Sequence, residues 1–198
     1  MNANKDIERR CYQCEIRTVD TDSRVVEGYA AVYNSDSVDM GFTERIMPGA
    51  FDGVIEKSDV FALLNHSDER GVLARSKFGK GSLSLEIDDT GLKYRFEAPN
   101  TALGDELLEN LKRGDVDSSS FAFTVDREEW VNEGTEKEEK WLRKIVKVRR
   151  LYDVSPVYTP AYPATSCFSR ALDELEAKKN EVAMMRQQVM LDEIKNKY

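Results

Sequence analysis

The sequence predicts a mainly β protein with flanking helices, an α+β fold, and three observations support this class. Short runs rich in β-branched and aromatic residues recur between residues 14 and 158, as is typical of strands. Two segments with helical features interrupt these runs, and a third helical pattern occupies the end of the chain. We therefore expect an N-terminal segment over residues 1–13, a β domain over 14–168 and a C-terminal helical tail over 169–198.

Strands are predicted where apolar side chains alternate or cluster in short runs. The clearest run, RVVEGYAAVYN, is rich in valine and aromatic residues, which favour pleated structure. Leu83, Leu85 and Ile87 alternate in a run that Asp-Thr-Gly joins to the next one, so these two runs predict a hairpin. Residues 132–140 are charged and predict a solvated loop. The predicted strands are residues 24–34, 59–66, 71–78, 82–88, 92–98, 118–130 and 141–157.

Three helices are predicted around the strands. Pro48 opens a short one at residues 48–51, because its missing N–H does no harm in a first helical turn. Residues 101–113 carry leucines at helical spacing, acidic residues near the start, basic residues in the last turn and Gly114 as the stop. The third helix runs from about residue 170 to the end, with a broken apolar stripe among many charges.

The composition suits one ordinary domain with an appendage. Of the 198 residues, 40% are apolar and 33% are charged, enough for a core that needs no disulfides. The net charge of −8 argues against a direct nucleic-acid partner, which would favour a basic patch. No apolar run approaches the roughly 20 residues that span a bilayer, and the first residues, MNANKDIERR, are polar. We therefore expect no membrane partner and no secretion.

The three cysteines are an odd number, which indicates a reducing compartment rather than a disulfide framework. Cys11 and Cys14 form a CxxC pair, which raises a zinc or redox interpretation. Structural zinc takes four ligands, and only Cys167 and His66 remain to complete the set, both far away in the sequence. We therefore expect no metal and no cofactor, and interpret the pair as ordinary thiols at the entry to a strand.

His66 is the only histidine of the chain. Histidine is the side chain whose ordinary pKa lets it take and return a proton near neutral pH. Any mechanism that needs such a base must therefore use His66, and a three-histidine metal site is excluded. What remains is a two- or three-residue hydrolytic arrangement, or no catalysis.

A serine nucleophile is predicted within Ser118-Ser119-Ser120-Phe121-Ala122-Phe123. In a strand, Phe121 and Phe123 face one side while Ser120 and Ala122 face the other. The phenyl rings would anchor the strand in the core, and the small residues would leave room for an extended peptide near Ser120. The alternative is a serine on the polar face of an ordinary strand, and Ser118 shares the parity of Ser120.

The acid of the arrangement is predicted at Asp153, the one carboxylate in the apolar and prolyl stretch LYDVSPV. A carboxylate there is costly to bury unless it is paired or hydrogen-bonded. It could accept the Nδ1–H of a histidine and fix its tautomer; the alternative is an acid that caps a turn or pairs with Arg149 or Arg150. Because no GxSxG motif is present, an α/β-hydrolase is not expected.

At these residues the sequence resembles the prohead proteases of tailed bacteriophages, whose fold is similar to that of the herpesvirus capsid assembly protease. The resemblance is spread over roughly residues 16–164 and rests on ordered motifs. They are Gly-Tyr-Ala-Ala-Val-Tyr at 28–33, Phe-Thr-Glu-Arg-Ile-Met-Pro-Gly-Ala-Phe at 42–51, Leu-Asn-His at 64–66, residues 114–123 around Ser120, and LYDVSPVYTPAYP at 151–163.

The resemblance implies a closed or nearly closed β-barrel and a serine endopeptidase with His66, Ser120 and Asp153 as its catalytic residues. It further implies cleavage of a scaffold region, in the major capsid protein or in a separate scaffold protein, inside the assembling prohead in the host cytoplasm. Autocleavage is expected as well, and a homo-oligomer is left open. The helical tail would dock on scaffold, self-associate, be clipped, or pack on its own domain.

The chain departs from the family's pattern at three positions. Ser119 stands where Met is common, Ala122 where Gly is common, and Asp153 where Glu is frequent. The last change shortens the acid by one methylene, so Asp117 or Asp115 competes for its role.

Two rival functions remain. One is a non-catalytic β-barrel module of phage capsid assembly, for binding or scaffolding. The other is a cysteine hydrolase that pairs Cys11, Cys14 or Cys167 with His66, although none of these cysteines lies in a matching nucleophile segment.

Overall fold

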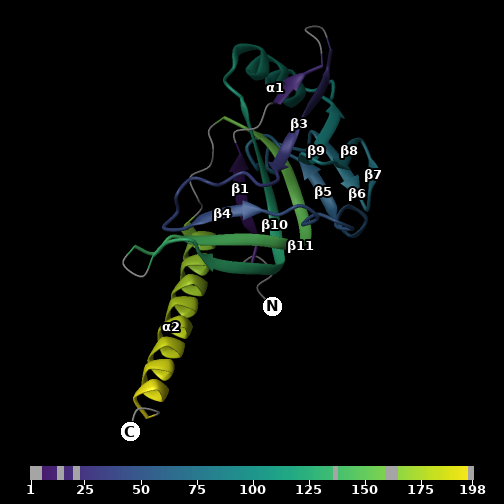
Figure 1. The fold of residues 1–198 in the computed structure, drawn as a ribbon. Helices are drawn as coiled ribbons and strands as arrows, with labels where there is room; N and C mark the ends of the chain where they lie inside the picture. The colour runs from purple at the N-terminus through teal and green to yellow at the C-terminus, as the bar shows by residue number, and fades with distance from the viewer. Residues whose placement is uncertain (1–5, 13–15, 20–22, 136–137, 159–164, 196–198) are drawn as a thin grey trace.

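The computed structural model describes residues 6–12, 16–19, 23–135, 138–158 and 165–195, and within the last range side chains are described for residues 175–192. In these residues the fold is mainly β with helices, as predicted, but it has two α-helices where three helices were expected. The strands form two sheets, and the C-terminal helix α2 (Thr165–Lys195) projects from the β-rich body (Figure 1). The predicted division into three segments stays a prediction.

The larger sheet is built around a long antiparallel hairpin of β10 (Ser118–Asn132) and β11 (Trp141–Val157). The N-terminal strand β1 (Glu8–Tyr12) pairs with the free edge of β10, while β4 (Thr43–Ile46) and β5 (Asp59–Ala62) pair in parallel with different parts of β11. Two short strands, β6 (Ala74–Lys77) and β7 (Lys80–Gly81), complete the order β1-β10-β11-β5-β6-β7.

The smaller sheet has the order β2-β3-β9-β8 and is antiparallel throughout. Its strands are β2 (Ile16–Thr18), β3 (Val25–Val32), β8 (Leu83–Ile87) and β9 (Gly91–Glu97). The hairpin of β8 and β9 confirms the turn predicted there: the Asp88 carboxylate accepts hydrogen bonds from the backbone N–H groups of Thr90 and Gly91. Gly91 fits because a Cβ at this position would lie 2.0 Å from the Ala31 carbonyl oxygen.

One hydrophobic core joins the two sheets. Phe121 and Phe123 of the larger sheet and Val26, Leu92 and Phe96 of the smaller one belong to a single buried cluster. Helix α1 (Ala102–Arg113) adds Leu107 to this cluster. Its start is capped by the Thr101 hydroxyl, which accepts from the Gly104 N–H, and it ends at Gly114 in the left-handed conformation. The closed or nearly closed barrel is not confirmed by this pairing of strands and stays a prediction.

Residues 48–51, predicted to start a helix, form turns instead, followed by a single 3₁₀ turn η1 (Ile55–Lys57). Gly49 adopts a φ of 81°, which interrupts a right-handed helix. The Ala50 carbonyl accepts a hydrogen bond from the Val148 N–H of β11 instead of from an N–H one helical turn further along the chain. Burial of Phe51 against the sheet outweighs the local helical preference.

Other predicted bounds hold with small shifts. The run at residues 59–66 is a strand only as far as Ala62, and α2 starts five residues before the predicted position of 170. The strands β1, β2, β4 and β7 are not in the predicted set.

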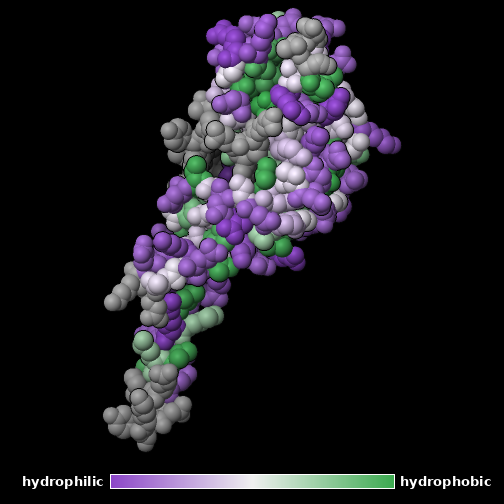
Figure 2. Space-filling model, turned by 45° about the horizontal axis from the view of Figure 1, so that its top comes forward, coloured by the Kyte–Doolittle hydropathy of each residue, from purple (hydrophilic) through white to green (hydrophobic). Residues whose placement is uncertain are grey.

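Helix α2 contacts the body of the protein through its first half. Leu175 is buried with Met40, Phe42 and Trp141. Farther along, Met184, Met185 and Met190 are more than half exposed, and apolar and polar side chains alternate over the projecting part (Figure 2). In the described ranges, none of the helices has the length and hydropathy that a membrane crossing requires.

Candidate active site

Ser120 lies on the middle strand of three, β1-β10-β11, opposite Cys11 on one side and Ser155 on the other. Its side chain shares a face with Ala122, while the stacked rings of Phe121 and Phe123 point into the core with a centroid separation of 4.6 Å. The alternation predicted from the sequence is therefore confirmed. Ser120 is fully buried.

His66 reaches this face from the turn that follows β5. Leu63 and Leu64 are buried and hold the start of the turn, and the Asn65 N–H donates to the Pro156 carbonyl at 2.9 Å. Asn65 and His66 both adopt left-handed backbone conformations, with φ of 54° and 58°. Such conformations are costly for residues other than glycine and tend to be found at functional sites. The turn thus directs the imidazole across β11 towards β10.

Asp153 lies on β11 between Ala122 of β10 and Phe61 of β5. Its Oδ1 atom is 2.6 Å from His66 Nδ1 and accepts a hydrogen bond from the Ser155 hydroxyl at 2.7 Å. A carboxylate at this distance fixes the proton of the imidazole on Nδ1, because the carboxylate can only accept. Nε2 is then left to act as the acceptor when the ring is neutral.

The distance between His66 Nε2 and Ser120 Oγ is 2.6 Å. The same hydroxyl lies 2.9 Å from the Arg10 carbonyl of β1 and can donate to it. A single hydroxyl proton cannot serve both acceptors at full strength. With a neutral imidazole the proton goes to Nε2, which activates the oxygen; with an imidazolium, Nε2–H donates to Oγ and the hydroxyl turns to Arg10.

The structure brings the three predicted site residues together in one hydrogen-bonded chain, Ser120–His66–Asp153. The competing candidates lie elsewhere: the Ser118 hydroxyl donates to Asp117, Asp115 pairs with Arg113, and Arg149 pairs with Asp126. Ser155 is a residue that sequence reasoning missed, although its spacing of two from Asp153 places both on one face of the strand.

The cysteines do not join this chain of hydrogen bonds in the described part of the molecule. The Cys11 thiol donates to the Ser119 carbonyl at 3.1 Å. Cys14 lies outside the described residues, as does the side chain of Cys167, so the predicted reading of the CxxC pair is untested. The described residues contain no group of three or more His, Cys, Asp or Glu that could hold a metal ion.

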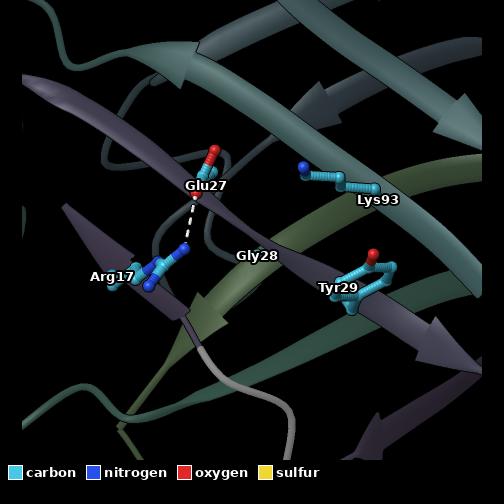
Figure 3. A pocket seen from close by; sticks show the side chains of 5 residues that line it. All are labelled: Arg17, Glu27, Gly28, Tyr29 and Lys93. Carbon is cyan, nitrogen blue, oxygen red and sulfur yellow. Dashed lines mark hydrogen bonds and ion pairs between the residues drawn. The ribbon is translucent and has the colours of Figure 1, made fainter. Parts of the chain in front are cut away.

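A cleft of about 410 Å³ opens beside His66 and Asp153. Its walls carry the apolar side chains of Phe61, Leu63, Val72 and Tyr152, and its remaining charged groups are Arg9 and Asp68. The lining is therefore mixed, with His66, Asp153, Arg9 and Asp68 beside the larger side chains. A smaller hollow of about 180 Å³ on the other sheet is lined by the Arg17–Glu27 ion pair, Gly28, Tyr29 and Lys93, and its lining includes no serine, cysteine or histidine (Figure 3).

A buried ion cluster lies on the opposite face of β1. It consists of Glu8, Arg10, Glu44, Glu128 and Arg143, joined by ion pairs between two arginines and three glutamates. Burial alone would raise the pKa of Glu44, but Arg10 and Arg143 outweigh that effect and hold it below its usual value. The cluster ties β1 to β4, β10 and β11, and so fixes the strand that carries the Arg10 carbonyl beside Ser120.

A hydroxyl, an imidazole and a carboxylate in this hydrogen-bonded order, on a mainly β fold, define the class of site found in serine hydrolases. The comparison of the chain with protein families agrees with this class. A family model described as caudovirus prohead serine protease (Peptidase S78) matches residues 12–180, and the chain belongs to this family. Neither the curated proteins nor the solved structures contain a significant match to the chain.

Proposed function

We propose that the protein is a capsid maturation endopeptidase in which Ser120 is the nucleophile, His66 the general base and acid, and Asp153 the residue that orients His66. The observation that carries this proposal is the continuous hydrogen-bonded chain from Ser120 Oγ through His66 to Asp153 Oδ1, with 2.6 Å at each step. A serine hydroxyl is a weak nucleophile without an adjacent base, and the base needs an orienting group.

In the proposed mechanism, His66 Nε2 takes the hydroxyl proton as Ser120 Oγ attacks the scissile carbonyl carbon. The new C–O bond forms while the π pair of the carbonyl moves to its oxygen. The tetrahedral intermediate then expels the amine, which receives the proton from His66, and the acyl-enzyme remains on Ser120. Water then attacks the ester carbonyl while His66 takes a proton from it. The second tetrahedral intermediate expels Ser120 Oγ, which receives that proton from His66, and the carboxylic acid product is released. Because Ser120 is fully buried, a path from the cleft to Oγ must open when the peptide binds.

The family assignment supports a scaffold region, in the major capsid protein or in a separate scaffold protein, as the substrate. We place the reaction inside the assembling prohead in the host cell. Autocleavage and self-association belong to the same proposal. The cleft beside His66, whose lining includes Phe61, Leu63 and Val72, offers room for a side chain of an extended peptide.

Co-expression with the neighbouring capsid protein tests the proposal. Wild type is expected to process the capsid protein at sites that mass spectrometry maps, and the Ser120→Ala variant is expected to leave it intact. Ser118→Ala is the matched control, because Ser118 lies on the same face of β10 but its hydroxyl donates to Asp117. Undiminished cleavage by Ser120→Ala would reject the nucleophile. Absence of cleavage by wild type would favour the non-catalytic assembly module.

A further inference from the structure

Arg9 lies in the row of side chains that runs across the candidate active site. It pairs with Ala122 of β10, which pairs with Asp153 of β11, which pairs with Phe61 of β5. Directly paired residues point to the same face of a sheet, so the Arg9 side chain shares the face of Ser120 and Asp153. Only the methyl group of Ala122 stands between Arg9 and the acid in this row.

The Arg9 guanidinium has unused hydrogen-bonding capacity at this position. Its Nε atom is buried and has no hydrogen-bond partner among the described residues, and Arg9 lines the cleft together with His66 and Asp153. Buried donors are nearly always paired, so an unpaired one calls for an explanation. The neighbouring Arg10, by contrast, is paired with Glu8 and Glu44 on the other face of the strand.

We propose that Arg9 is a catalytic residue that donates a hydrogen bond to the oxygen of the scissile carbonyl as negative charge develops on it. This inference rests on the proposed peptidase function. Donors placed in advance where charge develops account for a large part of catalysis in acyl transfer. The step is the attack described above: the π pair of the carbonyl becomes the lone pair of the oxyanion, and the guanidinium N–H faces it without transferring its proton.

The charges around the cleft favour this role over recognition of an acidic substrate side chain. Asp68 and Asp153 line the same cleft as Arg9, so a permanent substrate carboxylate would meet two like charges. The oxyanion meets the same two carboxylates, but it forms together with the imidazolium of His66, whose positive charge offsets the repulsion. Arg149 and Arg150 do not line the cleft: Arg149 pairs with Asp126, and Arg150 stacks over Tyr152.

The rate of reaction with an alkyl fluorophosphonate tests the proposal without a known substrate. In this reaction Ser120 Oγ bonds to phosphorus, fluoride leaves, and the phosphonyl oxygen occupies the place of the oxyanion. Arg9→Met is expected to lower the second-order rate constant by about 10²–10³-fold, the usual effect of losing one such donor. Arg127→Met is the matched control, since Arg127 is exposed on the distal part of β10, and it is expected to react at the wild-type rate.

Guanidinium rescue separates a chemical role from a structural one. Millimolar guanidinium chloride is expected to restore part of the rate in Arg9→Ala, whereas the same concentration of sodium chloride is not. An Arg9→Met variant that is folded and reacts at the wild-type rate would overturn the proposal. So would Arg9→Ala that guanidinium fails to rescue while its thermal midpoint equals that of wild type. If wild type itself gives no adduct on Ser120, the peptidase proposal fails, and with it this one.

Discussion

Two buried polar clusters lie on opposite faces of the N-terminal strand β1, and they differ in how completely their groups are paired. On one face, Glu8 and Arg10 enter the ion cluster, where each charged group has an opposite partner. On the other face, Arg9 and Cys11 flank the site residues Ser120 and Asp153. Alternation along five residues thus supplies both a structural cluster and a reactive one.

The difference between the clusters lies in their spare capacity for hydrogen bonds. The buried carboxylates of Glu8 and Glu44 accept hydrogen bonds from guanidinium groups at both of their oxygens, and so they hold strands together. The site has a hydroxyl with two competing acceptors and a guanidinium Nε that has no partner among the described residues. We infer that the first cluster contributes to the stability of the fold and the second to chemistry, and variants can separate the two.

The largest expected effect is the loss of peptide cleavage in the Ser120→Ala variant. Ser120→Ala should lower the rate of peptide cleavage by about 10⁶-fold, as loss of a serine nucleophile does elsewhere. Its free energy of unfolding should fall by only about 1–3 kcal/mol, the cost of leaving the buried partners of the hydroxyl unsatisfied. Cleavage kinetics and urea unfolding of the same preparation check both parts. A large loss of stability would show that the site also holds the fold together.

Asp153→Asn should follow with a loss of about 10⁴ in kcat, because an amide does not fix the proton on His66 Nδ1 as a carboxylate does. The matched control is Asp59→Asn, an acid on β5 that pairs with Arg75 at the surface. The control should cleave at the wild-type rate. Equal activity of Asp153→Asn and wild type would reject Asp153 as the acid and leave Asp117 or Asp115 as candidates.

Glu44→Gln should affect stability instead of chemistry. Removing one charge from a buried ion pair costs about 3–5 kcal/mol, and Glu44 faces both Arg10 and Arg143. Because the pKa of Glu44 is held below its usual value, its contribution is present above the pKa of the unfolded chain and is lost as the pH falls through the folded value. Urea unfolding at several acidic pH values should show a smaller loss with pH in the variant.

The site residues were predictable because each stands out in its segment. His66 is the only imidazole, Ser120 lies between small and aromatic residues in a strongly patterned strand, and Asp153 is isolated among apolar neighbours. Local pattern also predicts the β8–β9 hairpin and the two strands that become β10 and β11. The resemblance to the prohead proteases combined these three residues into one catalytic arrangement, and the family match supports that resemblance.

The parts that could not be predicted depend on contacts between distant segments. The strand β1 reads Glu-Arg-Arg-Cys-Tyr, and nothing in such a charged run shows that Glu44 and Arg143 will neutralise it. The turns at residues 48–54 depend on a hydrogen bond from Val148 to Ala50. Arg9 was missed for the same reason, since its place in one row with Ala122 and Asp153 follows only from the order of the strands.

Ser155→Ala should give a smaller effect than Asp153→Asn, because it removes one of two donors to Asp153 Oδ1 and leaves His66 in place. A hydrogen bond to a charged group contributes about 1.5–3 kcal/mol, so kcat should fall by about 10–100-fold. Ser155 is a positioning residue in this proposal. The pH dependence of kcat should therefore shift in the variant, whereas KM should not. An unchanged pH profile would leave Ser155 with a packing role only.

The smallest effect is expected for Asp36→Asn, which removes an exposed ion pair of the same strand, β4, that carries Glu44. Arg45 follows Glu44 on β4, but its side chain points outward and pairs at 2.6 Å with Asp36, which is 51% exposed. The hydrogen bond from Arg45 lowers the pKa of Asp36 below its usual value, so this contribution also disappears as the pH falls. Exposed pairs are screened by water and salt, and Asp36→Asn should cost less than about 1 kcal/mol. If urea unfolding gave equal losses for Asp36→Asn and Glu44→Gln, burial would not distinguish the ion cluster, and the structural role assigned to that face of β1 would have to be given up.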